Sequence, residues 1–153
     1  YCDKIKKKHK PVILSHHMLL GLKGEDKMSK SDPESAIYMD DTEADVNRKI
    51  KKSYCPPGVK DKNPILEYIK YIILEKFNRF TVLRKEEHGG KINYKNYLDV
   101  ENDYVNGSLH PGDLKKAVCV YINEILKPVR DYFNTNKEAQ KLRSLVKSYN
   151  KNK

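Results

Sequence analysis

Apolar residues return every three or four positions through most of the chain, and the longest such stripe lies in its second half. It starts after His110-Pro111, where proline suits a first helical turn, and it predicts the longest helix of the chain. Pro128 is expected to bend this helix near its end. The face that would pack on a core consists of Leu114, Ala117, Val118, Tyr121, Ile122, Ile125, Leu126 and Val129.

Further helices are predicted from the same spacing and from their start signals. Thr42 is a capping residue for a helix over about 43–54. Asn63-Pro64 combines a cap with a proline in the first turn, and the apolar residues after it keep helical spacing. We also expect a short helix over 97–104 and a last helix over about 137–149.

Extended and irregular segments separate these helices. The apolar run 12–14 predicts a buried strand, 36–39 a short extended piece and 80–83 a short strand, while 1–10 reads as the end of a surface helix that Pro11 stops. His88-Gly89-Gly90 predicts a turn. Cys55-Pro56-Pro57-Gly58 breaks the chain strongly enough to be a candidate domain boundary.

The change in pattern along the chain predicts a fold that is α/β at first and then mostly α. We place the end of an α/β domain in residues 1–41 and a helical domain in residues 42–153. The chain has 153 residues, which suits one to one and a half domains.

The excess of basic residues favours a polyanionic binding partner. The chain carries 31 Lys and Arg against 21 Asp and Glu, a net charge of +10. Solubility alone explains such a charge equally well, and the strong preference for Lys over Arg points to a composition bias as well.

The cysteines and the hydropathy of the chain indicate in which cellular compartment the protein works. Cys2, Cys55 and Cys119 match no disulfide framework or zinc pattern, which favours a reducing, cytoplasmic compartment. No apolar run approaches the roughly 20 residues of a membrane span, and no signal peptide is recognisable. Tyr1 is not an initiator residue, so we expect the chain to start inside a longer protein.

Lys27-Met28-Ser29-Lys30-Ser31 is the sharpest local signal in the chain. It places two cations and two hydroxyls in a loop soon after an apolar run, and open α/β sheets bind ligands beyond the carboxyl ends of their strands. Lysine side chains, hydroxyls and free N–H groups suit a triphosphate. Gly21 and Gly24 would give this loop freedom to close. A solvated loop in a lysine-rich protein is the plainer interpretation of its composition.

The full string resembles the KMSKS signature of class I aminoacyl-tRNA synthetases, which bind ATP. Leu19-Leu20-Gly21-Leu22 before it and Asp32-Pro33 after it extend the resemblance. The resemblance implies that Lys27 and Lys30 neutralise the leaving pyrophosphate during amino-acid activation, in which Mg²⁺ accompanies ATP. It further implies ATP contacts from Met18, Leu19, Met28, Ser29 and Ser31, with Met28 packing the loop and the backbone near Met18-Leu19 meeting adenine.

Several later blocks resemble the tyrosyl-tRNA synthetases of eukaryotes and archaea, in order along nearly the whole chain. They are Cys55–Gly58, Leu66–Lys70, Val82–Arg84, His88–Gly90, His110–Lys115 and Leu126–Arg130. The resemblance implies the C-terminal portion of such an enzyme, with the end of a Rossmann-like catalytic domain in 1–41 and an anticodon-binding helical domain in 42–153. Its substrates would be tyrosine, ATP and tRNA(Tyr).

The same resemblance implies that His110 and Asp113 contact the first anticodon base and that His88 stacks on it. Asp can accept from the Watson–Crick edge of a guanine, and a splayed base needs a flat partner. A smaller ring at His88 departs from the larger aromatic expected there. The residues alone also fit a capping Asp113 and a surface His110.

Two other clusters leave alternatives open. Arg48, Lys49, Lys51 and Lys52 fit a solvated helix face, a contact with the tRNA backbone or a nuclear-import signal. His16-His17 lack a third ligand at metal spacing, so no metal site is predicted.

The first class I signature, the HIGH-type motif, and a tyrosine pocket are absent from this sequence and are expected upstream of Tyr1. The resemblance also implies a homodimer formed through that upstream region and no membrane partner. A tryptophanyl-tRNA synthetase and a non-catalytic tRNA-binding module remain alternatives.

Overall fold

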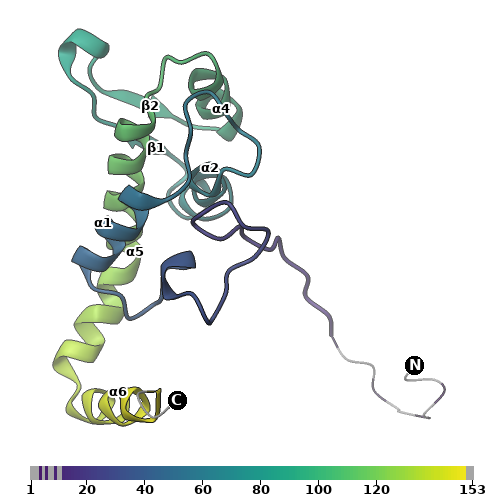
Figure 1. The fold of residues 1–153 in the computed structure, drawn as a ribbon, viewed down its shortest axis with the longest axis vertical. Coiled ribbons are helices and arrows are strands. Elements are labelled where there is room, and N and C mark those ends of the chain that lie inside the picture. Colours follow the sequence, from purple (N-terminus) through teal and green to yellow (C-terminus); the bar gives the residue numbers. More distant parts are fainter. Residues whose placement is uncertain (1–3, 5, 7–8, 10–11, 151–153) are drawn as a thin grey trace.

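The computed structural model of the chain describes residues 4, 6, 9 and 12–150, and helices dominate it (Figure 1). Most of the predicted surface helix over 1–10, and Pro11 after it, lie outside the described residues. In chain order the elements are the 3₁₀-helix η1 (Pro33–Ser35), α1 (Glu43–Lys52), α2 (Pro64–Tyr68), the π-helical segment η2 (Ile69–Ile73), α3 (Leu74–Phe77), β1 (Phe80–Val82), the 3₁₀-helix η3 (Glu86–His88), β2 (Ile92–Tyr94), α4 (Tyr97–Val105), α5 (Pro111–Thr135) and α6 (Lys137–Asn150).

The predicted helix starts are confirmed by their capping contacts. The Thr42 side chain accepts the N–H of Asp45 at 3.1 Å, and the Asp45 carboxylate accepts the N–H of Thr42 at 3.3 Å, which makes a capping box. The Asn63 side chain accepts the N–H of Ile65 at 3.1 Å at the start of α2. Each contact satisfies an N–H that has no partner inside the helix.

The helices α2 and α3 form one uninterrupted helical run through the π-helical segment η2. Asn78 ends this run in a left-handed conformation, with φ of 53°, and its N–H donates to the carbonyl oxygen of Leu74 at 2.9 Å. The chain therefore reverses there and leads directly into β1. The long helix α5 continues through Pro128 to Thr135.

The sheet is a two-stranded antiparallel hairpin in which Phe80 pairs with Tyr94 and Val82 with Ile92. The strand predicted over 80–83 is confirmed as β1, and the predicted turn falls at Gly89 and Gly90, whose φ values are 88° and 60°. The partner β2 was not predicted, because three residues between two lysines show too little alternation to signal a strand.

The predicted buried strand over 12–14 is wrong for the described chain. Val12, Ile13 and Leu14 are 98%, 81% and 88% exposed and form no strand. A strand needs a neighbour for its N–H and C=O groups, and the one sheet within the described residues lies elsewhere. Ala36 is extended as predicted, with φ of −144° and ψ of 153°, but 36–39 form no strand.

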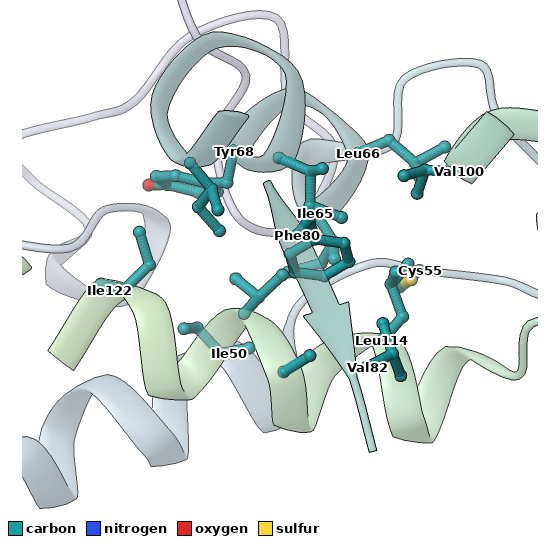
Figure 2. Close-up of a cluster of buried hydrophobic side chains, with 14 of the residues drawn as sticks. Ile50, Cys55, Ile65, Leu66, Tyr68, Phe80, Val82, Val100, Leu114 and Ile122 are labelled. Carbon is teal, nitrogen blue, oxygen red and sulfur yellow. The ribbon is translucent and has the colours of Figure 1, made fainter. Parts of the chain in front are cut away.

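The core lies between α5 and the elements that pack along it. Leu114 and Val118 are fully buried on the stripe of α5, as the spacing predicted. Figure 2 shows Ile50 of α1, Ile65 of α2 and Phe80 of β1 pointing into the same cluster. Residues on both sides of the Cys55–Gly58 break thus share one apolar core.

The last helix, α6, lies at the end of α5 opposite the hairpin (Figure 1). Arg143 and Lys147 both contact the Asp40 carboxylate at 3.1 Å. Arg143 also donates to the Asp40 carbonyl oxygen at 2.8 Å, which ties α6 to the segment before α1. Within the described residues, none of these helices combines the length and the hydropathy that crossing a bilayer requires.

Two valines on one helix test the assignment of the buried stripe. Val118 is fully buried and Val120 is 66% exposed, so Val118→Ala should lower the free energy of unfolding by about 2 kcal/mol. Val120→Ala should stay within about 0.5 kcal/mol. Denaturant unfolding of both variants measures the difference, and equal losses would contradict the packing described here.

Candidate functional site

The KMSKS segment lies in a loop whose two ends are hydrogen-bonded together. The N–H of Leu22 donates to the carbonyl oxygen of Ser35 at 2.8 Å, which closes the base of the loop. The N–H of Tyr54, just after α1, donates to the carbonyl oxygen of Leu22 at 2.7 Å. Gly24 turns the chain with φ of 90°, beside the ring of Tyr54.

Ser35 organises the interior of this loop. Its side chain is buried, and its hydroxyl oxygen accepts the N–H of Ser29 at 2.9 Å and donates to the carbonyl oxygen of Asp32 at 2.7 Å. The hydroxyls of Ser29 and Ser31 bond each other at 2.8 Å. No role was predicted for Ser35, since a serine four positions after the KMSKS segment carries no signal by itself.

The lysines of the loop fall into two groups. Lys23 forms an ion pair with Asp32, and this hydrogen bond holds the pKa of the Asp32 carboxyl below its ordinary value. Lys27 and Lys30 are exposed, and neither ammonium group has an ion-pair or hydrogen-bond partner among the residues that the structure describes. Their charge is therefore available to an anionic ligand.

The segment that carries Met18 and Leu19 is fixed by one carboxylate of α2. Glu67 accepts the N–H of Leu20 at 2.8 Å and lies 3.0 Å from Nε2 of His17. The ring of His17 stacks on Tyr71 with centroids 4.1 Å apart. Met18 is 64% exposed, whereas Leu19, like Met28, packs against the apolar core.

The second predicted group of residues lines one cavity of about 450 Å³. It lies between the turn after β1 and the start of α5, and no residue of the KMSKS segment reaches it. The cavity brings together all three residues expected to contact a base. Its lining consists of Arg84, Lys85, His88, Gly107, Ser108, His110, Asp113 and Lys116.

The geometry of His110 fixes which nitrogen carries its proton. Its Nδ1 accepts the N–H of Gly112 at 3.0 Å and caps α5, so a neutral ring carries the proton on Nε2. Nε2–H has no partner among the described residues, so it can donate to a ligand. The Asp113 carboxylate lies 3.5 Å from Nζ of Lys116 and is mostly shielded from solvent. His88, on the other segment that lines the cavity, is 64% exposed.

Arg84 also lines the cavity, although no role was predicted for it. Its guanidinium donates to the carbonyl oxygens of Gly90 at 3.2 Å, Gly89 at 3.4 Å and Ser108 at 2.9 Å. One rigid fork of donors thus joins the two loops that carry His88 and His110. The position of this arginine ahead of a Gly-Gly pair was the only sequence signal for its role. Its hydrogen-bond partners are backbone carbonyl groups, which no pattern of side chains reveals.

The basic cluster of α1 does not form one solvated face. Lys49 is 4% exposed, contacts the Asp41 carboxylate at 2.6 Å and donates to the carbonyl oxygen of Ala36 at 2.9 Å. Arg48 pairs with Glu34 and Asp45. Burial removes water from the ammonium group of Lys49, and its ion pair and hydrogen bond offset that cost. Lys51 and Lys52 remain exposed.

Metal ligands do not gather in the described part of the chain. Among the described residues, no group of three or more His, Cys, Asp or Glu side chains could hold a metal ion.

Comparison with known proteins gives a consistent assignment. Residues 1–127 match the family described as tRNA synthetases class I (W and Y). The cytoplasmic tyrosine–tRNA ligase 1 of Arabidopsis thaliana is 60% identical over 150 residues, which cover 97% of this chain and 39% of that protein. The chain thus spans about two-fifths of the length of this relative.

Solved structures extend the comparison to the fold. Tyrosyl-tRNA synthetase of Leishmania major, in complex with fisetin, has a TM-score of 0.82 at 43% identity and covers 99% of this chain and 27% of that one. Tryptophanyl-tRNA synthetase of Giardia lamblia reaches a TM-score of 0.52 at 24% identity, covering 78% of this chain and 27% of that chain, which shows a likeness of fold only.

Ser35 and Ser31 offer a matched test of the loop. Ser35→Ala leaves the N–H of Ser29 without its buried acceptor and should cost about 1–3 kcal/mol of unfolding free energy. Ser31→Ala, exposed in the same loop, should change it by less than about 0.5 kcal/mol. Chemical denaturation gives both values, and an unchanged Ser35→Ala protein would exclude this role.

Proposed function

The chain belongs to the class I tRNA synthetases for tryptophan and tyrosine, and we propose that it is part of a tyrosine–tRNA ligase. The proposed enzyme activates tyrosine with ATP and transfers it to tRNA(Tyr). This chain contributes the KMSKS loop and the recognition of the anticodon. The high identity to a tyrosine–tRNA ligase supports tyrosine as the amino acid.

One observation carries the proposal beyond family membership. His88, His110 and Asp113 come from two separate segments, and all three line a single cavity. A flat ring, a free Nε2–H donor and a carboxylate acceptor around one cavity suit the stacking and edge contacts of a splayed base. We therefore assign the cavity to the first anticodon base, with Asp113 accepting from its N–H groups.

In the proposed activation step, a carboxylate oxygen of tyrosine attacks the α-phosphorus of ATP. The bond from that phosphorus to its bridging oxygen breaks, and pyrophosphate leaves with the electron pair. Negative charge therefore grows on the leaving group, where Lys27 and Lys30 stabilise it more in the transition state than before. Ser29 and Ser31 support the closed loop, Met28 packs it, and the backbone near Met18 and Leu19 meets adenine.

We propose the same division of the chain as the sequence suggests. Residues 1–41 would form the end of a Rossmann-like catalytic domain and 42–153 the anticodon-binding domain. Lys51 and Lys52, the exposed pair of the basic cluster, are candidates for contact with the tRNA backbone. Mg²⁺ would accompany ATP, and no step in this chain is assigned to it.

The relatives also support proposals on the cellular location and the oligomeric state of the protein. The Arabidopsis protein is named as cytoplasmic, which supports a cytoplasmic location for this one. A homodimer, as the family resemblance implies, would form through regions outside this chain. The tryptophanyl alternative has weaker support, because the Giardia enzyme shares only 24% identity. A non-catalytic tRNA-binding module would bind tRNA without supporting tyrosine-dependent exchange.

Replacing a loop lysine tests the catalytic assignment. In the complete enzyme, Lys30→Ala should cost about 3 kcal/mol of transition-state stabilisation, because one positive charge facing the leaving pyrophosphate is lost. Tyrosine-dependent pyrophosphate exchange measures this loss. Lys127→Ala, an exposed lysine of α5, is the control. A wild-type exchange rate in Lys30→Ala would exclude the role of the loop.

Removing the carboxylate from the cavity should separate the two reactions. Asp113→Ala should weaken aminoacylation of tRNA(Tyr) by about 10-fold or more, the effect of losing one good base contact. Tyrosine activation without tRNA should stay nearly intact. Asp131→Ala on the same helix serves as the control. Equal losses in both reactions would point to a folding defect instead.

A further inference from the structure

The peptide group between Ser53 and Tyr54 is held on both sides by segments that lie far apart in the sequence. Its carbonyl oxygen accepts a hydrogen bond from Nζ of Lys115 at 2.7 Å. Its N–H donates to the carbonyl oxygen of Leu22 at 2.7 Å. Because a peptide group is planar and resists twisting, a shift of either partner reorients the plane that the other holds.

On one side, Lys115 connects this peptide to the cavity. It lies in the first turns of α5, two positions after Asp113, which corresponds to about 3 Å along a helix axis. The same Nζ donates to the carbonyl oxygen of Lys51 at 3.0 Å. Carbonyl groups at a helix end lack helical partners and favour a cation, so Lys115 fixes the end of α1 to the start of α5.

On the other side, the peptide holds the base of the KMSKS loop. Leu22 is 1% exposed, and its own N–H donates to the carbonyl oxygen of Ser35 at 2.8 Å. The ring of Tyr54 lies so close to Gly24 that a Cβ there would come within 3.2 Å of it. The loop therefore cannot shift at its base without moving this peptide.

We propose that Lys115 is a positioning residue that couples the anticodon cavity to the KMSKS loop through the Ser53–Tyr54 peptide. This inference rests on the proposed function. A base that binds Asp113 and His110 shifts or stiffens the start of α5, and Lys115 transmits the change to the turn that carries Lys27 and Lys30. Hydrogen bonds on the two sides of one peptide polarise each other and strengthen the link.

Steady-state kinetics of Lys115→Met in the complete enzyme test the coupling. This variant keeps the length and apolar stem of the side chain but has no donor. Two tRNA(Tyr) transcripts that differ only in the first anticodon base are compared in aminoacylation. In the wild type, the altered base should lower kcat and raise KM. In Lys115→Met, kcat with the matched tRNA should fall at least about fivefold, towards that of the altered tRNA.

Two features separate coupling from a merely structural role. The ratio of KM values between the two tRNAs should persist in Lys115→Met, and tyrosine-dependent pyrophosphate exchange without tRNA should be unchanged. Lys115→Arg should restore the kcat difference, and Lys127→Met should behave as the wild type. Three results would overturn the proposal. The ratio of kcat values between the matched and the altered tRNA could be as large in Lys115→Met as in the wild type, or the two kcat values could be equal in the wild type. Pyrophosphate exchange could also fall as much as aminoacylation in Lys115→Met.

Hydrogen exchange in the wild-type enzyme gives a second measurement that needs no folded variant. Binding of a matched anticodon stem-loop RNA should slow exchange of the Tyr54 amide more than binding of the altered RNA does. Protection of the 107–113 segment without any change at Tyr54 would refute the link. A wild type that lacks tyrosine-dependent exchange would refute the proposed function separately, while the Tyr54 amide still reports on the coupling.

Discussion

The apolar stripe of α5 is the contact on which the arrangement of both sites depends. Leu114 and Val118 are fully buried in it, and α1, α2 and β1 all pack against it. The start of α5 carries His110 and Asp113, while α1 leads directly into the peptide that holds the KMSKS loop. Apolar packing is non-directional, so the stripe sets only the distances between these elements. Hydrogen bonds at the ends of the elements set their orientation relative to one another.

Charge is divided between structural and available groups in a consistent way. Lys23, Arg48 and Lys49 are used in ion pairs that fix the loop and α1, and Arg84 is used in carbonyl contacts that fix the cavity. Lys27 and Lys30 have no such partner within the described residues. A net charge of +10 therefore says less about binding than the positions of the cations that the fold leaves unpaired within the described residues.

Local signals predicted most of the helices, because capping and spacing act within a few residues. Thr42, Asn63 and His110 begin helices as their positions suggest. Pairing between distant segments was not predictable. The strand β2 depends on β1, and the run 12–14 is apolar without forming a strand. The cavity residues were named through a family resemblance, whereas Arg84, Ser35 and Glu67 act on backbone groups of remote loops, which leave no pattern in the sequence.

The burial of Lys49 has a consequence for any factor that would recognise the basic run of α1 as a linear signal. A receptor that reads successive basic side chains from an extended segment would have to unwind α1 and separate Lys49 from Asp41. It would also expose Val46 and Ile50, which belong to the core. In the folded protein, this basic run is therefore not accessible as a linear targeting signal, and only partial unfolding would expose it.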